Sequence, residues 1–317
     1  MKAGFHQPAG KLRLVDFIAH AHRAGSPQER LRIGHRAGAQ QVGLSRYVLP
    51  PGARSMPVHA HADEEEIFHV LAGRGLVWID GVVHPVAAGD TIVHAAGGPA
   101  HTILAADTEL DVLSFRSGSR SGLTYLPRPQ VFWAGTRWIP ADAPHPFEAE
   151  AACGPLELPE PAAERPASIV ALADAPQEPG DRDGFLGLWR MPTAGDVARA
   201  SGLRHVTLDP GQMSCPPHWH AGEEELFVIL EGSGELMLLT NELEETRIPI
   251  RAGHVIARPP ASGVAHALVA GDAGITFLAY GTRRPEEIVY YPRSRKAFIG
   301  PLLVRVEPVA DYWDGEP

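Results

Sequence analysis

Histidines and a glutamate with the spacing of metal ligands occur twice in the sequence. The stretch 56–73, MPVHAHADEEEIFHVLAG, places two histidines one residue apart, ahead of three carboxylates and an apolar run. The stretch 216–232, PPHWHAGEEELFVILEG, repeats the arrangement with different intervening residues. Side chains two residues apart on an extended strand point to one face, so each histidine pair can converge on one point. A single His-x-His pair is usually structural, whereas the doubled pattern indicates metal binding.

Each copy offers four candidate metal ligands, three imidazoles and one carboxylate. A third histidine follows a glycine-containing turn in each copy, in AGGPAHTIL and in ASGVAHALV. The candidate ligands are His59, His61, Glu66 and His101 in the first copy, and His218, His220, Glu225 and His266 in the second. This donor set suits Zn, Fe, Ni, Mn or Co, and six-coordinate geometry leaves two positions open for water, dioxygen or a substrate. We therefore expect a divalent transition metal, with up to two ions per chain.

Polar residues near the candidate ligands are interpreted as structural. The flanking carboxylates are expected in solvated turns, with the orientation of a ligand histidine as the alternative; they are Glu64, Glu65, Glu223 and Glu224. The remaining histidines of these regions are expected at the surface, namely His69, His84, His94 and His254. Cys215 is interpreted as a bystander thiol. A recurring set after the last strand of each copy is expected to serve packing or dimer contacts rather than substrate binding: Tyr125, Arg128, Tyr290 and Arg293.

The repeat extends beyond the ligands and indicates a duplicated domain. Around the histidine pairs the two copies match at a constant offset of 159 (218 − 59), and around the third histidine at 165 (266 − 101). The six additional residues of the second copy are expected mainly in the hairpin LTNELEETR, residues 239–247. Two matching blocks in the same order divide the chain into domains at 1–155 and 156–317.

Short apolar runs bounded by turn residues predict an all-β fold. With 33 glycines and 30 prolines the sequence disfavours long helices, and the single helix that we expect is short and lies at residues 13–22. Residues 139–166 contain seven prolines and little apolar periodicity, which is typical of a connector between domains. A hydrophobic contact between the two domains is expected.

Charge and hydropathy exclude several classes of partner. The formal net charge of −10 and the absence of a Lys/Arg cluster argue against nucleic-acid binding. No apolar stretch is long enough for a spanning helix or a signal peptide, so we expect no membrane partner and a cytoplasmic location. One cysteine in each half gives no disulfide framework. A small-molecule substrate is the expected partner.

The quoted motifs resemble those of the cupin superfamily. GARSMPVHAHADEEEIFHVLAG and GQMSCPPHWHAGEEELFVILEG are similar to its first motif, and AGDTIVHAAGGPAH and AGHVIARPPASGVAH to its second. The resemblance covers residues 40–130 and 200–295, so the protein resembles a two-domain cupin, or bicupin, with no assigned function. It implies two jelly-roll β-barrels in tandem, the two ligand sets given above, and a homodimer.

Three functions follow from this resemblance as hypotheses. A metalloenzyme acting on a small oxygenated substrate is the first, with a dioxygenase-like oxidoreductase favoured because open metal positions in an apolar barrel suit dioxygen chemistry. A metal-assisted isomerase, lyase or decarboxylase is the second. A non-catalytic cupin that binds a small molecule is the third. Between the two metal centres, the stiffer turn before His266 favours the second as the catalytic one.

Overall fold

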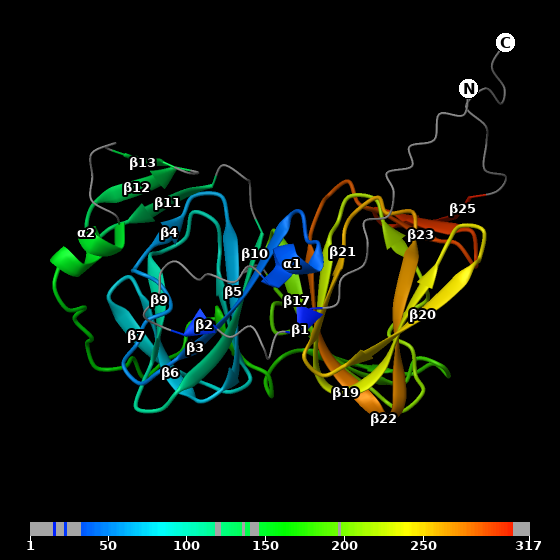
Figure 1. Cartoon of the computed structure of the whole chain (residues 1–317), viewed down its shortest axis with the longest axis horizontal. Coiled ribbons are helices and arrows are strands. Elements are labelled where there is room, and N and C mark those ends of the chain that lie inside the picture. The colour runs from blue at the N-terminus through cyan, green and yellow to red at the C-terminus, as the bar shows by residue number, and fades with distance from the viewer. Residues whose placement is uncertain are drawn as a thin grey trace, which may run out of the picture.

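The chain folds into two β-barrels that lie side by side (Figure 1). The structure, a computed structural model, describes residues 15–16, 22–23, 33–117, 122–134, 137–139, 146–195 and 198–306. Strands dominate these residues, and the described helices are α1 (Ile33–Ala37) and α2 (Pro146–Ala152). The predicted all-β fold with two tandem jelly-roll barrels is confirmed. Within the described residues, no helix has the length and apolar character needed to cross a bilayer.

The first barrel is built from three sheets, which are antiparallel except where β2 (His22–Arg23) pairs with β3 (Val42–Leu49). Its strands are β3 (Val42–Leu49), β4 (Ala60–His61), β5 (Glu65–Ala72), β6 (Arg74–Ile79), β7 (Val82–Ala87), β8 (Asp90–His94), β9 (His101–Ala105), β10 (Leu110–Ser117), β11 (Leu123–Leu126), β12 (Val131–Ala134) and β13 (Arg137–Ile139). The order β8-β5-β10-β3 forms the wall that faces the second barrel, β7-β6-β9 forms a second wall, and β13-β12-β11-β4 extends one end.

The second barrel repeats this plan with longer, uninterrupted strands. Its strands are β15 (Gln177–Gly180), β16 (Gly187–Arg190), β17 (Ser201–Leu208), β18 (Trp219–His220), β19 (Glu225–Leu239), β20 (Glu245–Arg251), β21 (His254–Arg258), β22 (Ala265–Thr282), β23 (Ile288–Tyr291), β24 (Lys296–Ile299) and β25 (Leu302–Arg305). Strand β19 corresponds to β5 and β6 together, and β22 to β9 and β10. Residues 240–244 connect β19 to β20 where residues 80–81 connect β6 to β7, so the second copy has the longer hairpin that the sequence predicts.

A glycine with left-handed backbone geometry marks the end of the ligand strand in both barrels. Gly73 has φ +86° and Gly232 has φ +75°. A Cβ atom on Gly73 would lie 1.9 Å from the carbonyl oxygen of Glu109, and one on Gly232 would lie 2.3 Å from that of Gly274. Both the backbone angle and the close approach therefore require glycine at this point of the motif.

Alternating side chains of the ligand strand fill two different cores. Phe68 and Val70 of β5 belong to the apolar cluster inside the first barrel, whereas Ile67 belongs to the cluster between the barrels. In β19, Phe227 and Ile229 likewise point into their own barrel. Because successive side chains on a strand alternate between faces, one strand contributes to the barrel interior and to the interface.

The N-terminal helix lies further along the chain than the sequence suggested. We expected a helix at 13–22, but Val15–Asp16 and His22–Arg23 form the short strands β1 and β2, and the other residues of that range lie outside the described part. The observed helix is α1, and Ile33 and Ala37 on it are buried in the cluster between the barrels. Tertiary packing against both barrels, rather than local periodicity, decides where this helix forms.

The proline-rich connector packs on the first barrel. Glu150 of α2 is buried and accepts hydrogen bonds from Arg54 and Arg128, and the Arg128 guanidinium also donates to the carbonyl oxygen of Gly154 at 2.6 Å. Further along, Arg165 pairs with Asp90 at 2.6 Å. Arg128, which recurs in both copies, thus holds the connector.

Each barrel receives a short strand from the segment that precedes the other barrel. Strand β14 (Ile169–Ala171) pairs with β8 of the first barrel, and β1 pairs with β21 of the second. Since β21 corresponds to β8, the two additions are equivalent. The first barrel's sheet thus extends to Ala171, while the domain division at residue 155 stays a prediction.

The interface between the barrels is apolar with two buried carboxylates. The Phe115 and Tyr280 rings stack with centroids 5.0 Å apart. Glu65 accepts hydrogen bonds from the Arg199 backbone N–H at 2.8 Å and from the Ser201 hydroxyl. Glu224 of the second barrel accepts from the backbone N–H groups of residues 40–42 at 2.6 to 2.9 Å.

These contacts correct the interpretation of the acidic turns. Glu65 is 1 % exposed and Glu224 is fully buried, so neither is solvated. Strand alternation turns each of them away from the ligand beside it and into the other barrel, where its charge is satisfied by N–H groups. Glu64 and Glu223, with side chains 22 % and 19 % exposed, remain near the surface and beside a candidate ligand histidine each.

The carboxylates that cross the interface should be strongly stabilising. We expect Glu65→Gln to lower the free energy of unfolding by about 2 kcal/mol, because a buried acceptor of charge-assisted hydrogen bonds is lost. Urea denaturation measures this. The exposed Glu109→Gln provides the control with the same chemical change. Equal unfolding midpoints for the two variants would contradict the assigned role.

Candidate metal centres

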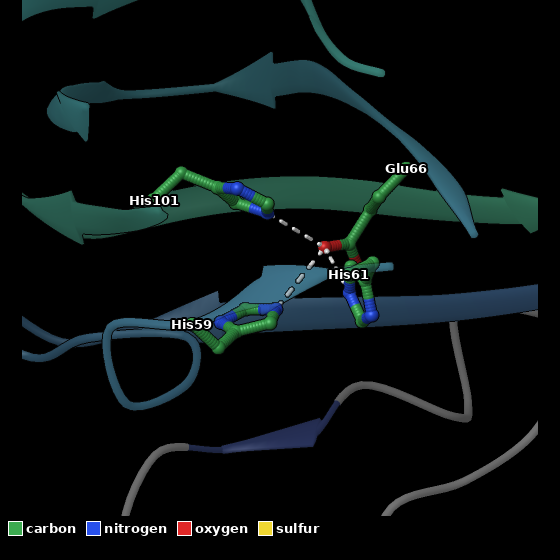
Figure 2. Close-up of side chains that lie close together, drawn as sticks. All are labelled: His59, His61, Glu66 and His101. Atoms are coloured by element: carbon green, nitrogen blue, oxygen red, sulfur yellow. Dashed lines mark hydrogen bonds and ion pairs between the residues drawn. The ribbon is translucent and has the colours of Figure 1, made fainter. Parts of the chain in front are cut away.

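The four candidate ligands of the first barrel meet at one point. His59 precedes β4, His61 lies in β4, Glu66 begins the inward face of β5, and His101 begins β9. The Glu66 Oε2 atom lies 3.5 Å from His59 Nε2, 3.6 Å from His61 Nε2 and 3.3 Å from His101 Nε2 (Figure 2). Figure 2 shows the three rings converging on this carboxylate from different elements of the barrel. The structure thus brings together all four residues that the sequence singled out.

Backbone carbonyl groups orient two of the three imidazoles. His59 Nδ1 lies 2.7 Å from the carbonyl oxygen of Pro57, and His101 Nδ1 lies 3.1 Å from that of Pro99. A carbonyl oxygen only accepts, so each Nδ1 carries the hydrogen and each Nε2 presents a lone pair to the centre. This is the tautomer that binds a metal through Nε2.

The other two ligands are oriented by side chains that the sequence did not single out. His61 Nδ1 lies 3.2 Å from the Thr124 hydroxyl and 3.3 Å from Glu64 Oε2. The Ser114 hydroxyl donates to Glu66 Oε1 at 2.7 Å, which leaves Oε2 for the histidines. The alternative interpretation of Glu64, an acceptor that orients a ligand histidine, fits this geometry. Thr124 and Ser114 lie 63 and 48 residues from their partners, and no local motif identifies them.

Electrostatics keep this centre in the protonation state that a cation requires. Burial lowers the pKa of His59 to about 4, although the neighbouring Glu66 raises it. Burial raises the pKa of Glu66, but the imidazoles around it outweigh burial and hold the pKa well below the usual range. Glu66 is therefore ionised and His59 neutral, which are the forms of these side chains that bind a cation.

The first centre fits a divalent metal ion. One donor atom from each residue lies within 4.8 Å of the other three, and all four residues are buried. Ligand atoms around one ion with bonds of about 2.1 Å lie about 3.0 to 3.4 Å apart, close to the separations found here. The buried Nε2 atom of His61 has no hydrogen-bond partner among the described residues, as expected of a ligand atom.

The second centre is similar but looser. The donor atoms of His218, His220 and Glu225 lie within 4.8 Å of one another, a set that does not include His266. His220 Nε2 lies 3.1 Å from His218 Nε2 and 3.3 Å from Glu225 Oε2. His266 Nε2 lies 2.8 Å from Glu225 Oε2, but its ring centroid is 5.2 Å from that of His218. Three candidate ligands are thus grouped, with the fourth adjacent.

The second centre is also more open to solvent. The Glu225 side chain is 20 % exposed, whereas that of Glu66 is 1 % exposed. The His220 side chain is 12 % exposed, compared with 7 % for His61. The side chains of Glu225 and His220 are therefore the more exposed ones, although a cavity of about 170 Å³ borders His61 of the first centre.

Carboxylates surround His220 and favour a positive charge there. Burial lowers the pKa of His220, but Glu225 and then Glu287 outweigh it and raise the pKa to about 10. Glu287 Oε1 lies 3.3 Å from His220 Nδ1 and is held by the backbone N–H of Ala221 at 3.0 Å. A group of His220, Glu223 and Glu287 thus lies directly behind the candidate ligands.

Cys215 contacts a candidate ligand of the second centre. His218 Nδ1 lies 2.9 Å from the carbonyl oxygen of Pro216, which corresponds to Pro57 of the first copy. Cys215 Sγ lies 3.6 Å from the same nitrogen. The thiol expected to be a bystander therefore lies beside the ligand set, because the chain bends at residues 214–216 before β18 begins.

Three histidines expected at the surface are buried. His69 points away from Glu66 as predicted, but its face of β5 lies against the other barrel, and it is 3 % exposed. His84 lies on β7 and is 7 % exposed. The carbonyl oxygen of its neighbour Val83 accepts a hydrogen bond from the backbone N–H of Ala162 in the connector. His94 is 3 % exposed and stacks on His101, with ring centroids 3.6 Å apart. His254 is half-buried.

The copies differ in the residue that lies opposite the carboxylate ligand. His94 of β8 pairs with Glu66, and Arg258 of β21 pairs with Glu225. Burial lowers the pKa of His94 well below its usual value, so this position is neutral in the first centre. In the second centre the same position holds the guanidinium of Arg258.

Comparisons with known proteins place this geometry in a family. Residues 45–115 and 204–278 match the cupin domain family Cupin_2. No protein of curated function shows significant sequence similarity to the chain.

Among solved structures, oxalate decarboxylase from Lactobacillus farciminis in complex with formate is similar, with TM-score 0.57 and 19 % identity over 79 % of each chain. Oxalate decarboxylase from Bacillus subtilis at pH 4.6 has TM-score 0.55 and 19 % identity over 78 % of this chain and 69 % of that chain. These structures share the two-barrel fold. With a cupin domain in each half and a His/Glu cluster in each barrel, the chain belongs to the cupin superfamily as a bicupin.

Proposed function

We propose that the protein is a metal-dependent enzyme that acts on a small oxygenated substrate at the second centre. The observation that carries this proposal is the difference in exposure between the carboxylates, 20 % for the Glu225 side chain and 1 % for that of Glu66. A substrate must reach the metal, and Glu225 is the more exposed of the two carboxylate ligands. The first centre then holds its metal as a fixed part of the barrel.

Each barrel supplies one set of ligands in this proposal. His59, His61, Glu66 and His101 hold one ion, and His218, His220, Glu225 and His266 hold the other. A divalent metal supplies Lewis-acid polarisation of a bound oxygen atom. The chain's own contribution is to fix the imidazoles: Pro216 orients His218, and Glu287 orients His220.

Tyr291 lies where it can donate a hydrogen bond at the opening of the second centre. Its ring centroid is 5.5 Å from that of His218, and the residue is half-buried. Burial raises the pKa of the phenol, so the hydroxyl keeps its proton at neutral pH. A neutral phenol beside the metal ligands can orient an oxygen atom of the substrate.

Decarboxylation is the first reaction to test, and dioxygenation the second. The similar solved structures are oxalate decarboxylases, which favours the lyase alternative for this chain. The dioxygenase-like alternative is supported by the apolar wall behind His266, where the Phe227 ring centroid lies 5.6 Å from the imidazole. Release of CO2 without oxygen consumption indicates the first reaction, and oxygen uptake indicates the second. Ligand binding with neither would mean a non-catalytic cupin. The homodimer and the cytoplasmic location stay predictions.

Metal content tests the ligand assignment. We expect elemental analysis after metal supplementation to give close to two transition-metal ions per chain, because each barrel has its own donor set. Replacing His218 and His220 with alanine should remove about one equivalent and leave the other in place. A stoichiometry near zero for the supplemented wild-type protein would refute both sites.

Turnover tests the difference between the centres. Glu225→Gln should lower the activity by more than about tenfold, since it removes the charge that holds the reactive metal, and Glu66→Gln should lower it much less. Both values of kcat are to be compared at equal metal loading, with thermal unfolding as the check on folding. Equal losses, or the reverse order, would place the reaction elsewhere.

A further inference from the structure

Arg258 places a permanent positive charge in the wall of the second centre. It ends β21 directly opposite Glu225 in the sheet, so both side chains project from the same face. The residue is 8 % exposed. Burial lowers its pKa to about 10, although Glu225 raises it, so the guanidinium remains charged at neutral pH.

Among the described residues, the hydrogen bonds of this guanidinium are made by Nη2. Nη2 donates to the carbonyl oxygen of Val264 at 2.7 Å and approaches the Ser262 hydroxyl at 3.5 Å. In the part of the chain that the structure describes, Nε is buried and has no hydrogen-bond partner. An arginine offers five N–H groups, and a buried charged donor without an acceptor is strongly unfavourable. The wall of the second centre therefore has capacity for an anionic acceptor.

Metal binding would increase this capacity. Glu225 is the carboxylate whose charge partly balances that of Arg258. It is also a ligand of the proposed metal ion. Once Glu225 is shared with a divalent cation, the guanidinium loses much of its compensation. Glu223 and Glu287 lie on the Nδ1 side of His220, where backbone N–H groups of residues 284 and 221 hold them. They do not replace an acceptor at Arg258.

The first centre is arranged differently. There His94 takes the place of Arg258, and the arginine opposite Glu66 is Arg116 of the other neighbouring strand, which pairs with Glu64 at 3.8 Å. The carbonyl oxygen of Pro99 lies 3.1 Å from His101 Nδ1. In the second centre the equivalent carbonyl, that of Val264, is engaged by Arg258 instead. The Nδ1 atom of His266 is consequently buried without a partner among the described residues.

We propose that Arg258 binds a carboxylate group of the substrate at the second metal centre, so that the substrate is a small oxygenated acid. The proposal rests on the proposed function, because it requires a metal at this centre. The planar guanidinium matches a carboxylate with two parallel N–H donors, and Nε is one of the donors still available. When Nη2 turns to the carboxylate, the Val264 carbonyl becomes free to accept from His266 Nδ1, as Pro99 does from His101. Binding of the acid thereby orients the fourth ligand.

The experiment compares glycolate with glycolamide, which has the same shape and metal-binding hydroxyl but no charge. Isothermal titration calorimetry on metal-loaded protein gives both dissociation constants, and elemental analysis of each sample gives the metal content. We expect Arg258→Gln to weaken glycolate binding by about 10- to 100-fold, because a hydrogen bond to a charged group is lost. Glycolamide binding and metal content should change little. The exposed Arg204→Gln, which removes one positive charge from the same barrel, should leave both constants unchanged.

The outcomes separate this inference from the proposed function. If the second centre binds no metal, the proposed function fails and the inference fails with it. If metal binds but the ratio of the two dissociation constants is the same in wild type and Arg258→Gln, the inference alone is wrong. Should Arg258→Gln not fold, Arg258→Lys keeps the charge without the planar pair of donors. That variant should still weaken glycolate binding by several-fold, and unchanged binding would overturn the assignment.

Discussion

The alternation of side chains along one strand links each metal centre to the interface between the barrels. Glu66 points into the first barrel towards three imidazoles. Its neighbour Glu65 points out of it and accepts from the Arg199 backbone N–H and the Ser201 hydroxyl. The same pair of directions recurs at Glu225 and Glu224. A one-residue slip of register would turn every side chain of the strand to the opposite face, taking Glu66 away from the imidazoles and Glu65 away from the second barrel. The register of the ligand strand is thus fixed from both faces at once.

Duplication preserved the ligands and their carbonyl partners more closely than the walls around them. Pro57 and Pro216 orient equivalent histidines in the two barrels. Around the third histidine the copies diverge. His94 stacks on His101 in the first barrel, whereas Arg258 donates to the carbonyl oxygen of Val264 in the second. A ligand set constrains only the residues that contact the ion, whereas the surrounding wall controls solvent access and local charge. Two centres with the same donors are therefore free to acquire different chemistry.

The sequence predicts the fold and the composition of the candidate centres well because both follow from local patterns. Strand alternation places Phe68 and Phe227 correctly in the two barrel interiors, and the spacing of the histidines groups their rings. Residues whose role depends on distant partners were misjudged. The sequence places three buried residues at the surface, Glu65, Glu224 and His69. Nothing near them in the sequence indicates that the other barrel covers their face of the strand. The sequence also does not predict the roles of Thr124, Ser114 and Arg258, because their contacts depend on tertiary structure.

The reciprocal addition of β1 and β14 has a consequence for how the chain acquires its structure during synthesis. The sheet of the first barrel is complete only when Ile169–Ala171 has left the ribosome, well after its own ligand strands. Val15 pairs with Val255, so it gains this partner only after the 239 residues between them have been made (255 − 15 − 1). Contacts this far apart in sequence close slowly and leave sheet edges unpaired in the meantime. The nascent chain therefore passes through a stage in which a nearly complete barrel has an unpaired sheet edge. At this stage the edge can pair with other chains, and a molecular chaperone that covers it would prevent aggregation.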